Sequence, residues 1–238
     1  MKSLILAYGT VSYLSFLAVI LYMIGFVEGL SVPKDINSGV SGPLLESIPI
    51  DFALILLFGL SHSVMARPAF KERVTKFMPH AAERSTYVLV ANIALAILFW
   101  QWRPISTPIW SFSGIASIIL LAISMLGWVL VFWSTFLIDH FDLFGMRQVW
   151  LNYRGIEYSA HPFVVRGLYK YVRHPLMLGF LIAFWVTPNM TLGHLLFALL
   201  MTVYIFIGVI HEERDLARSL GDNYASYRER TSMIIPWR

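Results

Sequence analysis

The sequence predicts an all-α fold: a polytopic membrane helix bundle with four spans, followed by a C-terminal helical hairpin and a cytoplasmic amphipathic helix. Hydrophobic residues make up 58% of the 238 positions and charged residues only 13%, with a mean hydropathy of +0.67. Such a composition is too apolar for a water-facing surface. Several apolar runs are also long enough to cross a hydrocarbon core, which takes about 20 helical residues. The absence of cysteine excludes a disulfide framework and a thiolate metal site.

Four long apolar runs predict the four spans. They cover residues 4–30, 48–65, 87–102 and 112–138, and each is bounded by charge, proline or glycine. The first run is longer than the core of a signal peptide, and no small-residue cleavage pattern follows it. We therefore expect an uncleaved first span, and residues 1–138 are predicted to form a four-span membrane bundle.

The predicted hairpin follows a polar stretch. Residues 175–187 are apolar, but they would form only roughly 20 Å of helix, which is too short to span the bilayer alone. Pro188 and Asn189 predict a turn, and residues 190–210 predict a longer returning helix. The two segments are expected to form a hairpin whose first arm is re-entrant or strongly tilted.

The tail after the hairpin has a helical pattern of its own, which Gly221 is expected to interrupt. Four apolar or aromatic residues recur in it at helical spacing: Leu216, Leu220, Tyr224 and Tyr227. We expect an amphipathic helix that lies against the body of the protein. The loop, the hairpin and this helix are predicted to form one integrated region, residues 139–238.

Positive charge is concentrated on one side of the predicted membrane. Every lysine and arginine except Lys34 and Arg103 lies before the first span, in the loop after the second, in the loop before the hairpin, or in the tail that ends with Trp237 and Arg238. Cytoplasmic loops keep positive charge during insertion, so the N-terminus, the basic loops and the tail are predicted to face the cytoplasm from the cell (inner) membrane. Trp237 suits the membrane interface. The net charge of +4 is spread over several segments, so it predicts no nucleic-acid partner.

Arg173, His174 and Pro175 stand where the polar loop enters the short apolar arm. Pro175 suits the first position of a helix, and a helix start offers free N–H groups and a positive dipole to an anion. Gly179, one turn later, permits close approach by another helix or by a ligand. Alternatively, the arginine and histidine only anchor the helix at the lipid headgroups.

Glu212 and Glu213 follow the returning arm, where we expect a helix C-terminus that disfavours negative charge. Arg173, Arg214 or a ligand with hydroxyl or ammonium groups would compensate these carboxylates. A solvated helix end with local ion pairs is the alternative. If the hairpin brings its two ends together, Arg173, His174 and both carboxylates converge around one polar ligand.

From Gly167 onward the chain resembles the isoprenylcysteine carboxyl methyltransferase-like group of integral membrane methyltransferases. The group shares an Arg-His-Pro helix start, a following glycine, a Glu-Glu pair near the end of the hairpin and a Tyr-x-x-Tyr tail. The resemblance implies that S-adenosylmethionine binds from the cytosol, mainly to the C-terminal hundred residues. The matching positions, implied to bind the cofactor, are Tyr169, Arg173, His174, Pro175, Gly179, Glu212, Glu213, Tyr224 and Tyr227.

Four further segments, residues 61–68, 83–87, 99–104 and 138–145, resemble a thiol-methylating branch of the same group. This resemblance spans most of the chain. It implies an enzyme that transfers the methyl group of S-adenosylmethionine to a small thiol, methanethiol, giving dimethyl sulfide and S-adenosylhomocysteine. Two alternatives stay open: a methyltransferase of the same fold that acts on a lipid-borne amine or carboxylate, and a membrane protein without enzymatic activity.

A thiol acceptor needs a group that removes its proton or stabilises its thiolate form, because the thiolate is the nucleophile and thiol pKa values lie above neutrality. His62 is the candidate within a predicted span, where ionisable residues are costly and face the bundle interior. Its alternative role is a neutral histidine that joins two helices. His140 and Asp142 are the other candidates, in a segment that alternates polar and aromatic residues as a lined pocket would, and an ordinary interfacial loop is their alternative. The histidines show no metal-ligand spacing, so no metal is expected.

Overall fold

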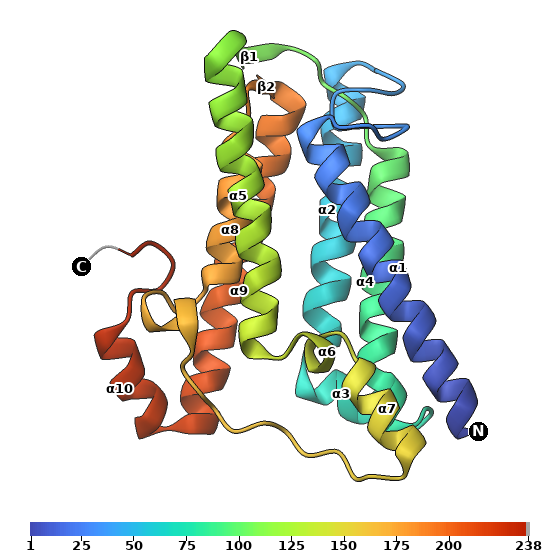
Figure 1. Ribbon diagram of the computed structural model, residues 1–238. Coiled ribbons are helices and arrows are strands. Elements are labelled where there is room, and N and C mark those ends of the chain that lie inside the picture. The colour runs from blue at the N-terminus through green and yellow to red at the C-terminus, as the bar shows by residue number, and fades with distance from the viewer. Residues whose placement is uncertain (237–238) are drawn as a thin grey trace. The chain divides into compact units, whose positions relative to one another are not determined.

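The computed structural model describes residues 1–236, so Trp237 and Arg238, assigned above to the cytoplasmic tail, lie outside the described residues. The described part is largely helical, and its one sheet has two short strands. Five of its helices are long and apolar enough to cross a membrane, which confirms the predicted all-α polytopic fold. The elements in chain order are α1 (Lys2–Glu28), α2 (Leu44–Met65), α3 (Pro68–Val74), α4 (His80–Gln101), β1 (Pro108–Ser111), α5 (Gly114–Ile138), α6 (His140–Leu143), α7 (Met146–Arg154), the 3₁₀ helix η1 (Gly167–Lys170), α8 (Pro175–Trp185), β2 (Asn189–Thr191), α9 (Leu192–Leu220) and α10 (Asp222–Arg230) (Figure 1).

The chain forms two compact units, and each combines two stretches of sequence. The first unit comprises Met1–Ile105 and Asp139–Pro162. The second comprises Ser106–Ile138 and Phe163–Arg238. The functional division into a bundle of residues 1–138 and a cofactor-binding region of residues 139–238 stays a prediction.

In the first unit, α4 packs against both α1 and α2, and α7 packs against α1. Aromatic residues fill the interior near the end of α4. Phe26 and Trp102 are fully buried and meet edge to face, with ring centroids 6.1 Å apart. The indole N–H of Trp102 donates a hydrogen bond to the carbonyl of Ile36 at 3.1 Å. The loop after α1 is thereby fixed to the end of α4, since a buried indole needs an acceptor.

In the second unit, α5 packs against α8, and α8 against α9. Gly179 confirms the expected close approach: a Cβ added to it would lie only 2.7 Å from the carbonyl oxygen of Gly127 on α5. Strands β1 and β2 pair antiparallel beside the turn of the hairpin, with Trp110 opposite Met190. This pairing connects the segment before α5 to the segment before α9. Asn189, predicted in a turn, opens β2 instead.

The hairpin itself is confirmed, because α8 ends at Trp185 and α9 returns. The expected helix end at Glu212 and Glu213 is wrong, since α9 continues to Leu220 and ends at Gly221 with a positive φ of 55°. The apolar run stops near residue 210, but glutamate, arginine, leucine and alanine all favour a helix, so the helix outlasts the apolar run. The tail pattern is accordingly divided at Gly221 between the last turns of α9 and α10.

Candidate functional site

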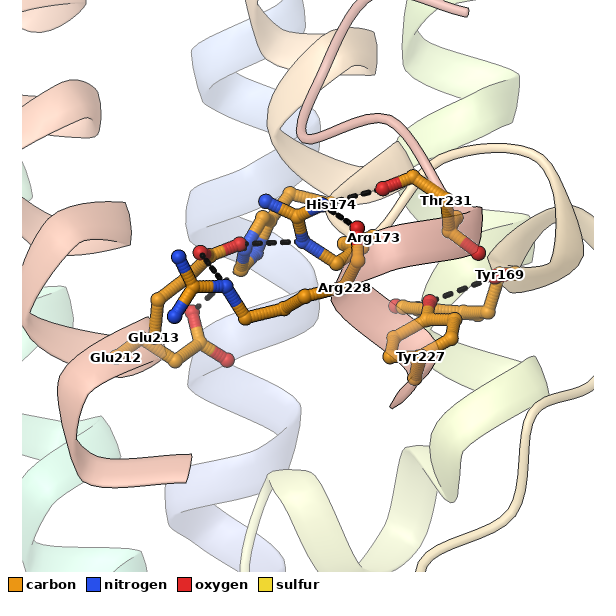
Figure 2. A network of polar contacts seen from close by, with 8 residues as sticks. All are labelled: Tyr169, Arg173, His174, Glu212, Glu213, Tyr227, Arg228 and Thr231. Carbon is orange, nitrogen blue, oxygen red and sulfur yellow. Dashed lines mark hydrogen bonds and ion pairs between the residues drawn. The ribbon is translucent and has the colours of Figure 1, made fainter. Parts of the chain in front are cut away.

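An ion pair joins the start of α8 to α9. Pro175 occupies the first turn of α8 and His174 is its N-cap, so the backbone turns into the helix directly after Arg173. The Nε of Arg173 donates to Oε1 of Glu213 at 2.6 Å, and Nε2 of His174 lies 3.1 Å from the same oxygen (Figure 2). The predicted convergence of the two ends of the hairpin is therefore confirmed for these three residues. Their binding of a cofactor stays a prediction.

The carboxylate of Glu213 is surrounded by cations. Its other oxygen lies 3.5 Å from Nε of Arg228 on α10. The side chains of Arg173 and Glu213 are each only 10% exposed, so water competes little with their contact. A buried ion pair of this kind is stable only when its remaining polar groups also find partners.

Arg173 finds those partners in the segment after α10. One of its terminal nitrogens donates to the backbone carbonyls of Arg228 and Thr231. The backbone N–H of Arg173 donates to the carbonyl of Ser232 at 2.8 Å, and that of His174 to the carbonyl of Met233 at 3.0 Å. The segment 231–233 thus holds both the backbone and the guanidinium at the start of α8.

Glu212 is in a different environment from its neighbour. Its side chain is 52% exposed, and its Oε2 lies 3.6 Å from Nδ1 of His174. The imidazole of His174 therefore lies between the two carboxylates. Because α9 continues past both glutamates, they do not lie at its C-terminus, and the unfavourable dipole effect expected there does not apply to them. The guanidinium groups of Arg173 and Arg228 compensate Glu213, and the imidazole of His174 contacts both carboxylates.

Aromatic residues gather beside the ion pairs. Tyr224 is 1% exposed, and its ring meets those of Phe163 and Tyr227 edge to face. The Tyr227 hydroxyl donates to the backbone carbonyl of Tyr169 at 2.6 Å. The Tyr224 hydroxyl is buried and has no hydrogen-bond partner among the residues that the structure describes.

These tyrosines are hydrogen-bond donors at neutral pH. Burial, reinforced by the charge of Glu213, raises the pKa of Tyr224 to about 12. Burial also raises the pKa of Tyr227 to about 12, against the opposing charge of Arg173. The pKa of Tyr169 is raised too, by burial first and then by the charge of Glu212. All three hydroxyls therefore stay protonated, and a buried donor without an acceptor such as that of Tyr224 costs free energy until it finds one.

Two of the predicted cofactor-binding positions have a visible structural role. Pro175 starts α8, and Gly179 lets α8 approach the backbone of α5 at Gly127 and Val131. Contact of Pro175 or Gly179 with a cofactor stays a prediction.

The three residues predicted to be catalytic all belong to the first unit. His62 on α2 lies 2.6 Å, through Nε2, from the hydroxyl of Tyr87 on α4. Arg84 stacks over the ring of Tyr87, with its Cζ 4.7 Å from the centroid. This contact joins two helices, as the packing alternative for His62 expects. A role of His62 in proton transfer stays a prediction.

His140 opens α6 and is buried. Its Nε2 lies 2.9 Å from the hydroxyl of Tyr13, and the rings of Tyr13 and Phe141 meet it edge to face. Burial lowers the pKa of His140, more than the nearby charge of Asp139 raises it. The imidazole is therefore neutral at physiological pH, which a general base requires.

Asp142 is held by Arg147 at 3.0 Å and by the Tyr158 hydroxyl at 3.2 Å. Asp139 caps α6, because its Oδ1 accepts from the N–H of Asp142 at 3.0 Å, while its Oδ2 lies 2.8 Å from Nε2 of His161. Asp142 thus belongs to a network of polar contacts around α6. Its participation in catalysis stays a prediction.

Sequence reasoning missed the contribution of Arg228 and of the backbone at Thr231, Ser232 and Met233. Arg228 follows Tyr227 directly, so the aromatic pair in the tail marked the right segment. The backbone contacts carry no side-chain pattern and leave no signal in the sequence. Among residues 1–236, no group of three or more histidine, aspartate or glutamate side chains is placed to hold a metal ion.

Comparison with known proteins adds to this geometry. The model of the NnrU protein family matches residues 52–236. Methanethiol S-methyltransferase 2 of Bradyrhizobium diazoefficiens is 53% identical over 98% of this chain and 90% of its own. Methanethiol S-methyltransferase 1 of the same species is 50% identical over 100% of this chain and 84% of its own. Methanethiol S-methyltransferase of Mycobacterium tuberculosis is 47% identical over 99% of this chain and 97% of its own. No solved structure matches the chain.

Proposed function

We infer that this chain, which belongs both to the NnrU protein family and to the family of methanethiol S-methyltransferases, is an integral membrane enzyme that methylates methanethiol to dimethyl sulfide. The observation that carries this function is identity of about half of all residues with named methanethiol S-methyltransferases along almost the whole chain. The helices long enough to span a membrane agree with an integral membrane enzyme.

S-Adenosylmethionine is the methyl donor in this proposal. When bound, it supplies an electrophilic methyl group on a sulfonium. The residues of the second unit fit such a ligand: the half-exposed carboxylate of Glu212 accepts hydrogen bonds, the less deeply buried ring of Tyr227 offers an aromatic surface, and the buried Tyr224 hydroxyl has no acceptor among the described residues. A nucleoside has acceptors for that hydroxyl and an aromatic base for the Tyr227 ring.

The ion pair of Arg173 and Glu213 joins the start of α8 to the C-terminal part of α9, and we assign it the task of holding the binding residues in place. Methyl transfer from a sulfonium is an in-line displacement, so its rate depends on fixed alignment. His174, between the two carboxylates, links Glu212 to this rigid pair.

His140 is the base that we favour for the thiol, because its imidazole is neutral and hydrogen-bonded at a defined atom to Tyr13. Asp142 and its partners hold the segment that carries His140. His62 is the second candidate base. Its contact with Tyr87 fixes the ring within the unit.

We further propose that the protein lies in the cell (inner) membrane with its N-terminus and its active site on the cytoplasmic side. The asymmetry of lysine and arginine supports this orientation, since only Lys34 and Arg103 lie in the opposite loops. Contact with membrane lipid follows from the apolar residues exposed on α1, α2 and α5.

The test is turnover by the purified full chain in detergent or lipid nanodiscs. S-Adenosylmethionine with a labelled methyl group and methanethiol are supplied, and labelled dimethyl sulfide is measured in the headspace. We expect formation of dimethyl sulfide that depends on both reactants. Label that enters a lipid extract instead would favour the lipid-borne acceptor, and a protein that binds no S-adenosylhomocysteine would support the non-enzymatic alternative.

A further inference from the structure

The two neighbouring glutamates of α9 have different tasks. Both oxygens of Glu213 face nitrogen atoms of the protein itself: Oε1 lies 2.6 Å from Arg173 and 3.1 Å from His174, and Oε2 lies 3.5 Å from Arg228. Its side chain is also almost fully buried. A carboxylate with both oxygens engaged has little to offer a ligand. Glu213 is thus a positioning residue rather than a direct acceptor.

Glu212 has the opposite character. Half of its side chain is exposed, and its contact with Nδ1 of His174, at 3.6 Å, is longer than a hydrogen bond. A carboxylate offers about four lone-pair sites, so Glu212 keeps most of its capacity to accept hydrogen bonds from an ammonium group.

Arg228 completes the arrangement with a positive charge. Its side chain is 50% exposed, and Nε is the atom that faces Glu213. The guanidinium of Arg228 points toward the carboxylate of Glu213, and its two terminal nitrogens extend beyond that contact (Figure 2). A guanidinium fork binds a carboxylate with two parallel hydrogen bonds, and here the fork is half-exposed.

We propose that Glu212 and Arg228 bind the two ends of the amino-acid group of the methyl donor, with the ammonium on Glu212 and the carboxylate on Arg228. This inference rests on the proposed function. A half-exposed anion and a half-exposed cation, both beside the Glu213 carboxylate, match a zwitterion (Figure 2). A phosphate would be repelled by Glu212, and a simple cation by Arg228, so the pair selects an α-amino acid rather than either.

Ligands that differ in one end test this pairing by calorimetry on the full chain. S-Adenosylmethionine is compared with its decarboxylated analogue, which keeps the sulfonium and the amine but lacks the carboxylate. We expect wild-type protein to bind the decarboxylated analogue about tenfold or more weakly, the value of a charge-assisted hydrogen bond. This comparison uses unaltered protein, so it does not depend on how well a variant folds.

Two variants then test which residue binds which end of the amino-acid group. Arg228→Gln should weaken binding of S-adenosylmethionine by a similar factor and leave binding of the decarboxylated analogue unchanged. Glu212→Gln should weaken binding of both, but not of 5′-methylthioadenosine, which lacks the whole amino-acid group. Arg230→Gln is the matched control, because Arg230 lies on the same helix and donates to its own helix at the carbonyl of Ser226. It should change no affinity.

The outcomes distinguish a failure of this inference from a failure of the proposed function. Equal wild-type affinity for S-adenosylmethionine and its decarboxylated analogue would overturn the assignment of Arg228 while leaving the methyltransferase intact. An Arg228→Gln protein that still discriminates between the two ligands would overturn it as well. Failure to bind any of the three nucleosides would contradict the proposed function itself.

Discussion

Gly127 on α5 and Gly179 on α8 approach each other so closely that a Cβ on either would collide with the backbone of the other. A Cβ on Gly127 would lie 2.8 Å from the carbonyl oxygen of Gly179, and a Cβ on Gly179 would lie 2.7 Å from that of Gly127. Both obstacles are backbone atoms, which cannot move aside as a flexible side chain would. The short arm of the hairpin is therefore fixed against α5 by the absence of two side chains.

Gly179→Ala should destabilise the second unit. Overpacking of a well-filled contact costs about 1–3 kcal/mol, and here α8 must shift, carrying His174 and Arg173 with it. We expect a lower midpoint of thermal unfolding in detergent and weaker binding of S-adenosylhomocysteine. Gly208→Ala on α9 is the control, because nothing lies within 4 Å of its added Cβ. That change should be neutral or gain about 0.5–1 kcal/mol from helix propensity. Equal effects of the two substitutions would contradict the packing argument.

Glu213→Gln should impair both stability and cofactor binding, because it leaves the buried guanidinium of Arg173 without its counter-charge. Breaking one partner of a buried ion pair costs about 3–5 kcal/mol. Glu212→Gln should affect binding only, since that side chain is half-exposed and its contact with His174, at 3.6 Å, is longer than a hydrogen bond. Urea unfolding and calorimetry, run on both variants, check this difference. If Glu212→Gln were the more destabilising of the two, the division of tasks between the glutamates would be wrong.

His140→Ala should spare binding of S-adenosylhomocysteine and reduce turnover. The pKa of His140 is lowered by burial, so the imidazole stays neutral to a pH below its ordinary 6.5 and takes up a proton only in more acidic solution. If His140 is the base, kcat should therefore fall on the acid side with a midpoint below 6.5, and that limb should vanish in the variant. His80→Ala is the control at an exposed histidine of the same unit. An unchanged pH profile in His140→Ala would assign the base elsewhere, with His62 the next residue to replace.

Much of the fold was predictable because membrane spans depend on hydropathy summed over about 20 consecutive residues. Apolar runs located α1, α2, α5 and the hairpin within a few residues. The end of α9 was not predictable in the same way, because a helix ends where its backbone is interrupted, at Gly221, rather than where its apolar residues end.

The candidate site divides along similar lines. Charged side chains at the two ends of a hairpin must find partners, and this requirement predicted the contact of Arg173 and His174 with Glu213. Which glutamate is buried depends on the rotation of α9 about its axis, and the sequence carries no direct record of it. The backbone carbonyls that hold Arg173 are equally invisible, since any residue type can supply a carbonyl.

Truncation after Arg230 should abolish cofactor binding without removing any side chain of the Arg173–Glu213 pair. It deletes the carbonyl of Thr231, which accepts from the Arg173 guanidinium, and those of Ser232 and Met233, which accept from the N–H groups at the start of α8. The two backbone N–H groups would then lack acceptors, at a cost of about 1–3 kcal/mol each where water cannot reach them, and the guanidinium would keep only the carbonyl of Arg228 of its two backbone acceptors. The matched control ends after Ile235 and keeps all three carbonyls. Calorimetry with S-adenosylhomocysteine on both truncated proteins measures the difference. Retention of full affinity by the shorter protein would mean that Glu213 alone positions Arg173.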